Sequence, residues 1–199
     1  MSTARRMTRI IPSTMSTQHP DNACEAFWCG KSFIATTDEI EDAYMAFQDL
    51  GCDEYMWDWE GKFVDEAVID KLFRRYTDYF RKNPLGKRKF LTYRIPNIWE
   101  EKGYRLARAF MNIVTSADLA EEFSFHSPPV IEVILPMTKS ADQILQVEKM
   151  FRKVAQLKCE IFENKKVCRF NAIEVIPLIE RGEDLIAADR LIAKYFDLY

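Results

Sequence analysis

Short apolar runs alternate with longer amphipathic stretches along the chain, and this alternation constrains the fold more than any other feature. Strands that alternate with helices predict βα units around a parallel sheet. A run that is apolar almost throughout, such as residues 130–137, favours a strand that is buried on both faces. The predicted strands are residues 54–59, 89–95, 130–137 and 172–179, with a weaker one at residues 9–17, which contains Pro12.

Each run is followed by residues with helical periodicity. Asp38 is expected to cap the first helix, and Gly51 is expected to end it. The other helices are predicted over residues 65–82, over residues 104–113, from Ser140 onward and over residues 183–196.

Polar residues stand where these strands end. His19, Asp58, Arg94, Lys139 and Glu180 follow the first to the fifth strand, and they are 39, 36, 45 and 41 positions apart. Functional groups at the carboxyl ends of successive strands are typical of a (β/α)8 TIM barrel. The alternative is an open, doubly wound sheet, which usually has a glycine-rich phosphate loop. The chain has six glycines and no GxGxxG motif.

The size of the chain limits the barrel interpretation. Five βα units use all 199 residues, whereas eight such units need about 250 residues. We therefore expect residues 1–199 to be the N-terminal part of a single larger barrel domain, with about five of its βα units.

Composition narrows the function classes. The net charge of −3, from 28 basic and 31 acidic residues, predicts no nucleic-acid partner. No secretory signal is recognisable, and no apolar run approaches the roughly 18 residues that span a bilayer, so we expect a cytoplasmic protein without a membrane partner. The five cysteines have no CxxC spacing, and we expect reduced thiols.

The residues at the strand ends suit an anionic substrate and a hard metal ion. His19 can act as a general base near neutral pH, although the polar cluster around it could also simply start a turn. Arg94 offers a planar fork for phosphate or carboxylate, and a structural salt bridge is the alternative. Glu180 suits Mg²⁺ or Mn²⁺, and the alternative is a carboxylate that stabilises the start of a helix.

Four segments carry a family resemblance: residues 15–22 (MSTQHPDN), 54–62 (EYMWDWEGK), 90–97 (FLTYRIPN) and 175–180 (VIPLIE). They resemble the archaeal-type phosphoenolpyruvate carboxylases, from about Ser13 to the end of the chain. The longer carboxylases of bacteria and plants are more distantly similar. Their Thr-Ala-His-Pro-Thr motif matches residues 17–21, and their Pro-Leu-Phe-Glu motif matches residues 177–180.

The resemblance implies a lyase that carboxylates phosphoenolpyruvate with bicarbonate, giving oxaloacetate and phosphate in anaplerotic carbon dioxide fixation. It implies Mg²⁺ or Mn²⁺ as the cofactor, held by Glu180. His19 then takes the proton of the carboxyphosphate intermediate, and Arg94 holds the phosphoryl or carboxylate group. Asp58 and Lys62 are expected to line the substrate site at the second strand.

The resemblance also sets expectations about completeness and partners. In the family a second metal-binding aspartate and further arginines lie on later strands, so we expect little activity from residues 1–199 alone. The complete enzyme is expected to be a homo-oligomer that binds phosphoenolpyruvate and bicarbonate. The alternatives are a non-catalytic fragment that associates with a partner chain, and another lyase barrel acting on phosphoenolpyruvate or a 2-oxo acid.

Overall fold

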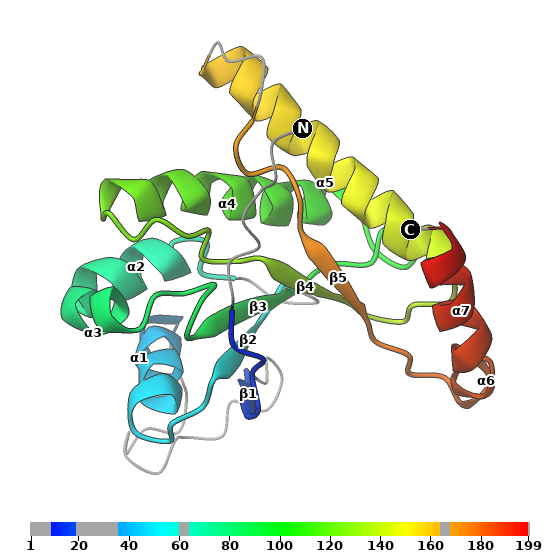
Figure 1. Cartoon of the computed structure of the whole chain (residues 1–199), viewed down its shortest axis with the longest axis horizontal. Helices are drawn as coiled ribbons and strands as arrows, with labels where there is room; N and C mark the ends of the chain where they lie inside the picture. Colours follow the sequence, from blue (N-terminus) through cyan, green and yellow to red (C-terminus); the bar gives the residue numbers. More distant parts are fainter. Residues whose placement is uncertain (1–8, 19–35, 60–63, 164–167, 199) are drawn as a thin grey trace.

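The computed structural model describes residues 9–18, 36–59, 64–163 and 168–198. Within them lies a sheet of five strands, all parallel, whose order in space is their order in the sequence (Figure 1). The strands are β1 (Met15–Thr17), β2 (Glu54–Asp58), β3 (Phe90–Arg94), β4 (Glu132–Leu135) and β5 (Glu174–Pro177). All five predicted strands and their parallel pairing are confirmed.

Helices follow the strands as the periodicity predicts. They are α1 (Thr36–Gln48), α2 (Val68–Arg75), α3 (Thr77–Lys82), α4 (Gly103–Glu122), α5 (Ala141–Phe162), α6 (Gly182–Ile186) and α7 (Ala188–Leu198). Ser140 caps α5 as expected, because its hydroxyl accepts a hydrogen bond from the Gln143 N–H. Gly51 has a φ of 71°, the left-handed conformation that glycine adopts readily just after a helix.

Two stretches that were each predicted as one continuous helix are each divided into two helices. The helix expected over residues 65–82 is interrupted at Tyr76, whose φ of −129° and ψ of 39° lie outside the helical region. The Tyr76 ring stacks parallel to Tyr44 of α1, with 3.6 Å between ring centroids, so a tertiary contact accompanies the break. Likewise, the helix expected over residues 183–196 is divided into α6 and α7 at Ala187.

The two faces of the sheet have different environments. Tyr55 and Trp57 of β2 are buried in the main hydrophobic core, which they share with apolar residues of α1, α2, α4 and α5. Because side chains alternate along a strand, Glu54, Met56 and Asp58 point to the opposite face. Figure 1 shows α1 to α5 in an arc along one side of the strands.

Burial on both faces, which we expected for the apolar strands, does not hold for β5. Val175 faces the helices and is 8% exposed, whereas Ile176 on the other face is 37% exposed. The fifth strand is therefore only half covered among the described residues. None of the helices in the described ranges combines the length and apolar character that crossing a bilayer requires.

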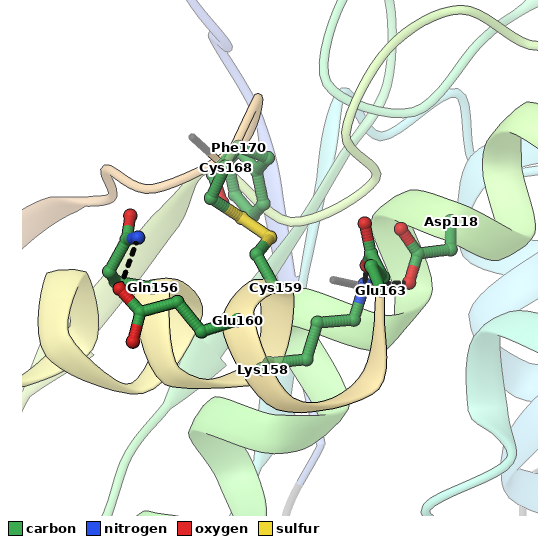
Figure 2. Close-up of a disulfide and its surroundings, with 8 residues drawn as sticks. All are labelled: Asp118, Gln156, Lys158, Cys159, Glu160, Glu163, Cys168 and Phe170. Atoms are coloured by element: carbon green, nitrogen blue, oxygen red, sulfur yellow. Dashed lines mark hydrogen bonds and ion pairs between the residues drawn. A yellow bond between two sulfur atoms is a disulfide. The ribbon is translucent and has the colours of Figure 1, made fainter. Parts of the chain in front are cut away.

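The expectation of reduced thiols is wrong for one pair of cysteines. Cys159, near the end of α5, forms a disulfide with Cys168, and the two Cα atoms are 5.6 Å apart (Figure 2). The chain turns back after α5 toward β5, so residues nine positions apart come within bonding distance. Cys52 is a free thiol, and Cys24 and Cys29 lie outside the described residues.

Candidate active site at the carboxyl ends of the strands

Hydrogen bonds join the carboxyl ends of the five strands into a continuous rim. The backbone N–H of Asp58 donates to the side chain of Gln18, which follows β1, at 3.2 Å. Further along the rim, the backbone donor–acceptor pairs are Trp59 to Arg94 (2.9 Å), Ile95 to Ile134 (3.0 Å) and Thr138 to Leu178 (3.0 Å). The described residues at the carboxyl end of each strand are therefore fixed to the neighbouring strand.

Asp58 and Arg94 form the central pair of this rim. They are directly opposite each other in the parallel register of β2 and β3. The Arg94 Nε donates to Oδ1 of Asp58 at 3.0 Å, and its Nη2 donates to Oδ2, so the contact is bidentate. The Asp58 side chain is fully buried, whereas the Arg94 side chain is 23% exposed. The salt bridge considered for Arg94 is thus present, and it fixes the guanidinium with one edge near solvent.

The residues around His19 and Lys62 can be described only up to their neighbours, because both residues lie outside the described ranges. Gln18 is 5% exposed and its backbone N–H donates to the Met56 carbonyl at 3.2 Å. The position just before His19 is therefore anchored on β2, beside Asp58.

Glu180 lies two strands away from Arg94, just beyond β5. One of its carboxylate oxygens accepts a hydrogen bond from the backbone N–H of Met137 at 2.8 Å. Met137 has a φ of 50°, a left-handed conformation that is uncommon for residues other than glycine. The β4–α5 loop therefore orients Glu180. This hydrogen bond comes from Met137 and not from the first turn of the short helix α6 that follows Glu180.

Lys139 and Glu100 form a second ion pair at the rim, with 2.5 Å between the Lys139 Nζ and the Glu100 Oε1. The hydrogen bond and the charge of Lys139 lower the pKa of Glu100 below its ordinary value. Lys139 thus links the loop after β4 to the loop after β3. Both side chains are partly exposed, so the pair adds little to stability.

Asn97 is a residue of this rim that the sequence analysis did not single out. It is fully buried, donates from Nδ2 to the Pro136 carbonyl at 2.8 Å and accepts from the Trp99 N–H at 2.9 Å. It fixes the loop after Arg94 to the end of β4. The available sequence signal was its position as the last residue of FLTYRIPN, one of the four segments that carry the family resemblance.

The described residues fit a divalent metal ion only in part. Glu180 offers carboxylate oxygen, which Mg²⁺ prefers, and Mg²⁺ often takes just one or two protein carboxylates together with water. Within the described ranges there is no group of three or more His, Cys, Asp or Glu side chains that could hold a metal. The described part of the site could therefore supply one carboxylate ligand, Glu180.

Sequence comparison assigns the chain that forms this rim to a family. The sequence model described as "Phosphoenolpyruvate carboxylase" matches residues 11–198 and so includes every strand of the sheet. The chain belongs to the phosphoenolpyruvate carboxylase family. The resemblance read from the four sequence segments is thereby confirmed.

Curated relatives agree with the family match. A phosphoenolpyruvate carboxylase of Leuconostoc mesenteroides is 46% identical over 96% of the chain, and one of Oenococcus oeni is 41% identical over 98%. An archaeal phosphoenolpyruvate carboxylase, from Pyrococcus horikoshii, is 40% identical over 94%. The chain spans only 38%, 39% and 42% of the lengths of these three relatives.

Proposed function

We propose that residues 9–198 form the first five βα units of a (β/α)8 barrel that carboxylates phosphoenolpyruvate with bicarbonate, giving oxaloacetate and phosphate. The observation that carries the proposal is the bidentate Asp58–Arg94 pair at the carboxyl ends of the strands, in a chain whose family match extends over residues 11–198. The strand order supports a barrel over a doubly wound sheet, because a doubly wound sheet reverses its order at a switch point.

Arg94 is assigned the role of binding the phosphoryl or carboxylate group of the substrate. The bidentate contact with Asp58 holds the planar guanidinium in one orientation, and a guanidinium in a fixed orientation suits a phosphate or carboxylate group. Because Asp58 holds Arg94 before the substrate arrives, little conformational entropy is lost on binding. Asp58 serves the substrate site mainly by positioning Arg94.

His19 is assigned the role of the base that takes the proton of carboxyphosphate, which promotes release of CO₂. The residue before it, Gln18, is held against Met56 and Asp58 of β2, and this contact supports the assignment. Lys62, four residues after Asp58 in the sequence, is assigned to the substrate site. An imidazole with a pKa near 6.5 can exchange a proton at neutral pH.

Glu180 would hold the divalent ion, Mg²⁺ or Mn²⁺. When bound, this ion supplies positive charge beside the oxygen of the pyruvate enolate. The Met137 N–H occupies one carboxylate oxygen of Glu180 and so orients the other. The resemblance implies a further metal-binding aspartate on a later strand of the family's chain. In the complete enzyme we propose a cytoplasmic homo-oligomer that needs no nucleic acid or membrane.

A chimera tests this function. Residues 9–198 replace the matching region of the Leuconostoc mesenteroides carboxylase, which is 46% identical. Oxaloacetate formation from phosphoenolpyruvate is then followed by coupling to malate dehydrogenase. We expect turnover that requires bicarbonate, and Glu180→Gln should raise the Mg²⁺ concentration needed for half-maximal rate. A folded chimera whose turnover does not depend on bicarbonate, or that acts instead on a 2-oxo acid, would show that the proposed function is wrong.

A further inference from the structure

One peptide group in the loop after β4 contacts the loops on both sides of it. The C=O of Pro136 accepts a hydrogen bond from Nδ2 of Asn97, in the loop after β3, at 2.8 Å. The N–H of Met137 belongs to the same peptide group and donates to Oε2 of Glu180, beyond β5, at 2.8 Å. This peptide bond is trans, so its C=O and its N–H point in opposite directions. The orientation that serves Asn97 is therefore the one that serves Glu180.

The turn that contains this peptide group has a conformation that methionine does not favour. Pro136 and Met137 are its two central residues. Proline at the second position and a φ of 50° at the third, Met137, are features of a type II turn, which usually has glycine there. Methionine suits the type I turn better, because residues with a side chain rarely adopt a positive φ. The two types differ by a rotation of the central peptide group, which would exchange the directions of its C=O and N–H.

Asn97 holds the peptide group against this preference. The side chain is fully buried, and its Oδ1 accepts from the Trp99 N–H at 2.9 Å, which directs Nδ2 toward Pro136. An amide nitrogen donates and does not accept. After rotation to the type I turn it would face the Met137 N–H, a second donor, and would lose its acceptor. A buried donor without an acceptor costs free energy, so Asn97 favours the type II turn.

We infer that Asn97 is a positioning residue for Glu180, and that it acts by holding the Pro136–Met137 peptide group with its N–H toward the Glu180 carboxylate. Groups that orient a ligating side chain commonly contribute roughly 10- to 100-fold to metal affinity. Asn97 follows Arg94 by three residues, so the same contact joins the proposed anion site to the proposed metal ligand. The metal role of Glu180 rests on the proposed function.

The loop has a second anchor that does not involve Asn97. The Thr138 N–H donates to the Leu178 carbonyl at 3.0 Å, and the Thr138 hydroxyl donates to the Leu135 carbonyl at 2.6 Å. These contacts lie outside the central peptide group of the turn. Loss of the Asn97 contact is therefore expected to rotate the peptide group without detaching the loop from β5.

The experiment measures Mn²⁺ binding to the chimera without phosphoenolpyruvate, from the electron paramagnetic resonance signal of free Mn²⁺. Asn97→Ser keeps an oxygen for the Trp99 N–H but is too short to reach Pro136, and it should raise the Mn²⁺ dissociation constant roughly 10-fold. The matched control is Asn112→Ser in α4, since Nδ2 of Asn112 likewise donates to a backbone carbonyl, that of Glu66. The control should change the constant by less than about twofold.

Two substitutions of Met137 separate positioning from a general effect on folding. Glycine favours the third position of a type II turn, so adding Met137→Gly to Asn97→Ser should return the dissociation constant to within about threefold of the parent value. Valine is disfavoured at a positive φ, so Met137→Val with Asn97 intact should raise the constant by about the same factor as Asn97→Ser. Met137 is only half-buried, so both variants are expected to fold.

Three results would overturn the inference: unchanged Mn²⁺ affinity in Asn97→Ser, equal losses in Asn97→Ser and Asn112→Ser, and a loss that Met137→Gly does not restore. Circular dichroism checks the folding of each variant, and if Asn97→Ser does not fold, Met137→Val without a loss of affinity overturns the inference equally.

The same measurements keep this inference distinct from the proposed function. The expected pattern of Mn²⁺ binding in a chimera without bicarbonate-dependent turnover would overturn the proposed function alone. An active chimera whose Mn²⁺ affinity does not depend on Asn97 would overturn this inference alone. A folded parent chimera that binds no Mn²⁺ would overturn the metal role of Glu180 and this inference with it.

Discussion

The two ends of the sheet differ in how they hold their charges. At the carboxyl ends, Asp58 pairs with Arg94, and Lys139 pairs with Glu100 in the flanking loops. At the amino ends, the single guanidinium of Arg9 binds both Glu132 and Glu174, at 2.8 and 2.6 Å. Among the described residues, the carboxyl end therefore carries ion pairs between neighbouring strands and loops, and the amino end carries one guanidinium held between two carboxylates.

The amino end is also where the chain is covalently fixed. The Cys159–Cys168 disulfide joins the end of α5 to the residues that lead into β5 (Figure 2). Next to it, the Lys158 ammonium donates to Asp118 and Glu163, and these acids raise its pKa even though burial opposes the charged form. In a barrel, the amino-end face contributes stability and the carboxyl-end face contributes chemistry. The contrast predicts that substitutions at the two ends have separable effects.

The largest effect is expected when an arginine is removed from each end in turn. In the chimera, Arg94→Met should lower kcat/KM by roughly 10² to 10³-fold, the usual loss for a charged group that stabilises an anionic transition state. Arg9→Met should leave kcat/KM within about threefold, because Arg9 binds Glu132 and Glu174 at the far end. Steady-state kinetics with phosphoenolpyruvate measures both. Comparable losses in the two variants would remove the functional contrast between the ends.

Much of this architecture could be predicted from the sequence, for a physical reason. Apolar runs bounded by polar residues define the parallel strands, and a polar residue at a strand end has few places to lie except the rim. Asp58, Arg94 and Glu180 are therefore found at the carboxyl ends as expected. Their partners could not be predicted, because the Asp58–Arg94 contact depends on the exact register of β2 and β3.

Other features depend on contacts that local patterns do not encode. Periodicity continues through Tyr76, but the helix breaks where this ring stacks on Tyr44, a residue 32 positions earlier. Cys159 and Cys168 pair because the chain reverses after α5, which cysteine spacing alone does not reveal. The Glu180 contact needs a left-handed backbone at Met137, and no glycine marks that turn.

The disulfide gives the next largest effect. Cys159→Ser should lower the free energy of unfolding by about 2–3 kcal/mol, because the bond closes a loop of about ten residues in the unfolded chain. Cys52→Ser, which removes a free thiol, should change it by less than about 0.5 kcal/mol. Chemical unfolding without reductant measures both. Equal stability of the Cys159→Ser variant and the parent would mean that this crosslink does not fix the amino end.

The smallest effects concern the response of the two ends to pH. Burial raises the pKa of Glu132, the charges of Glu174 and Glu54 add to this, and Arg9 opposes it. The folded protein then binds more protons than the unfolded chain just above pH 4.5, the ordinary value, so stability falls as pH rises through that window. Lys139 lowers the pKa of Glu100, so stability from this group is lost as pH falls below 4.5.

Two substitutions separate these opposite slopes. Glu132→Gln should flatten the stability profile above pH 4.5, and Glu100→Gln should flatten it below that value, because each removes one titrating group. Urea unfolding across about pH 3 to pH 7 resolves the two windows. The Glu100 effect should be the weaker, since its ion pair is exposed to water and screened by salt. If both variants flattened the same window, the two ends would share one electrostatic environment, and the separation of a stabilising end from a chemical end would not hold.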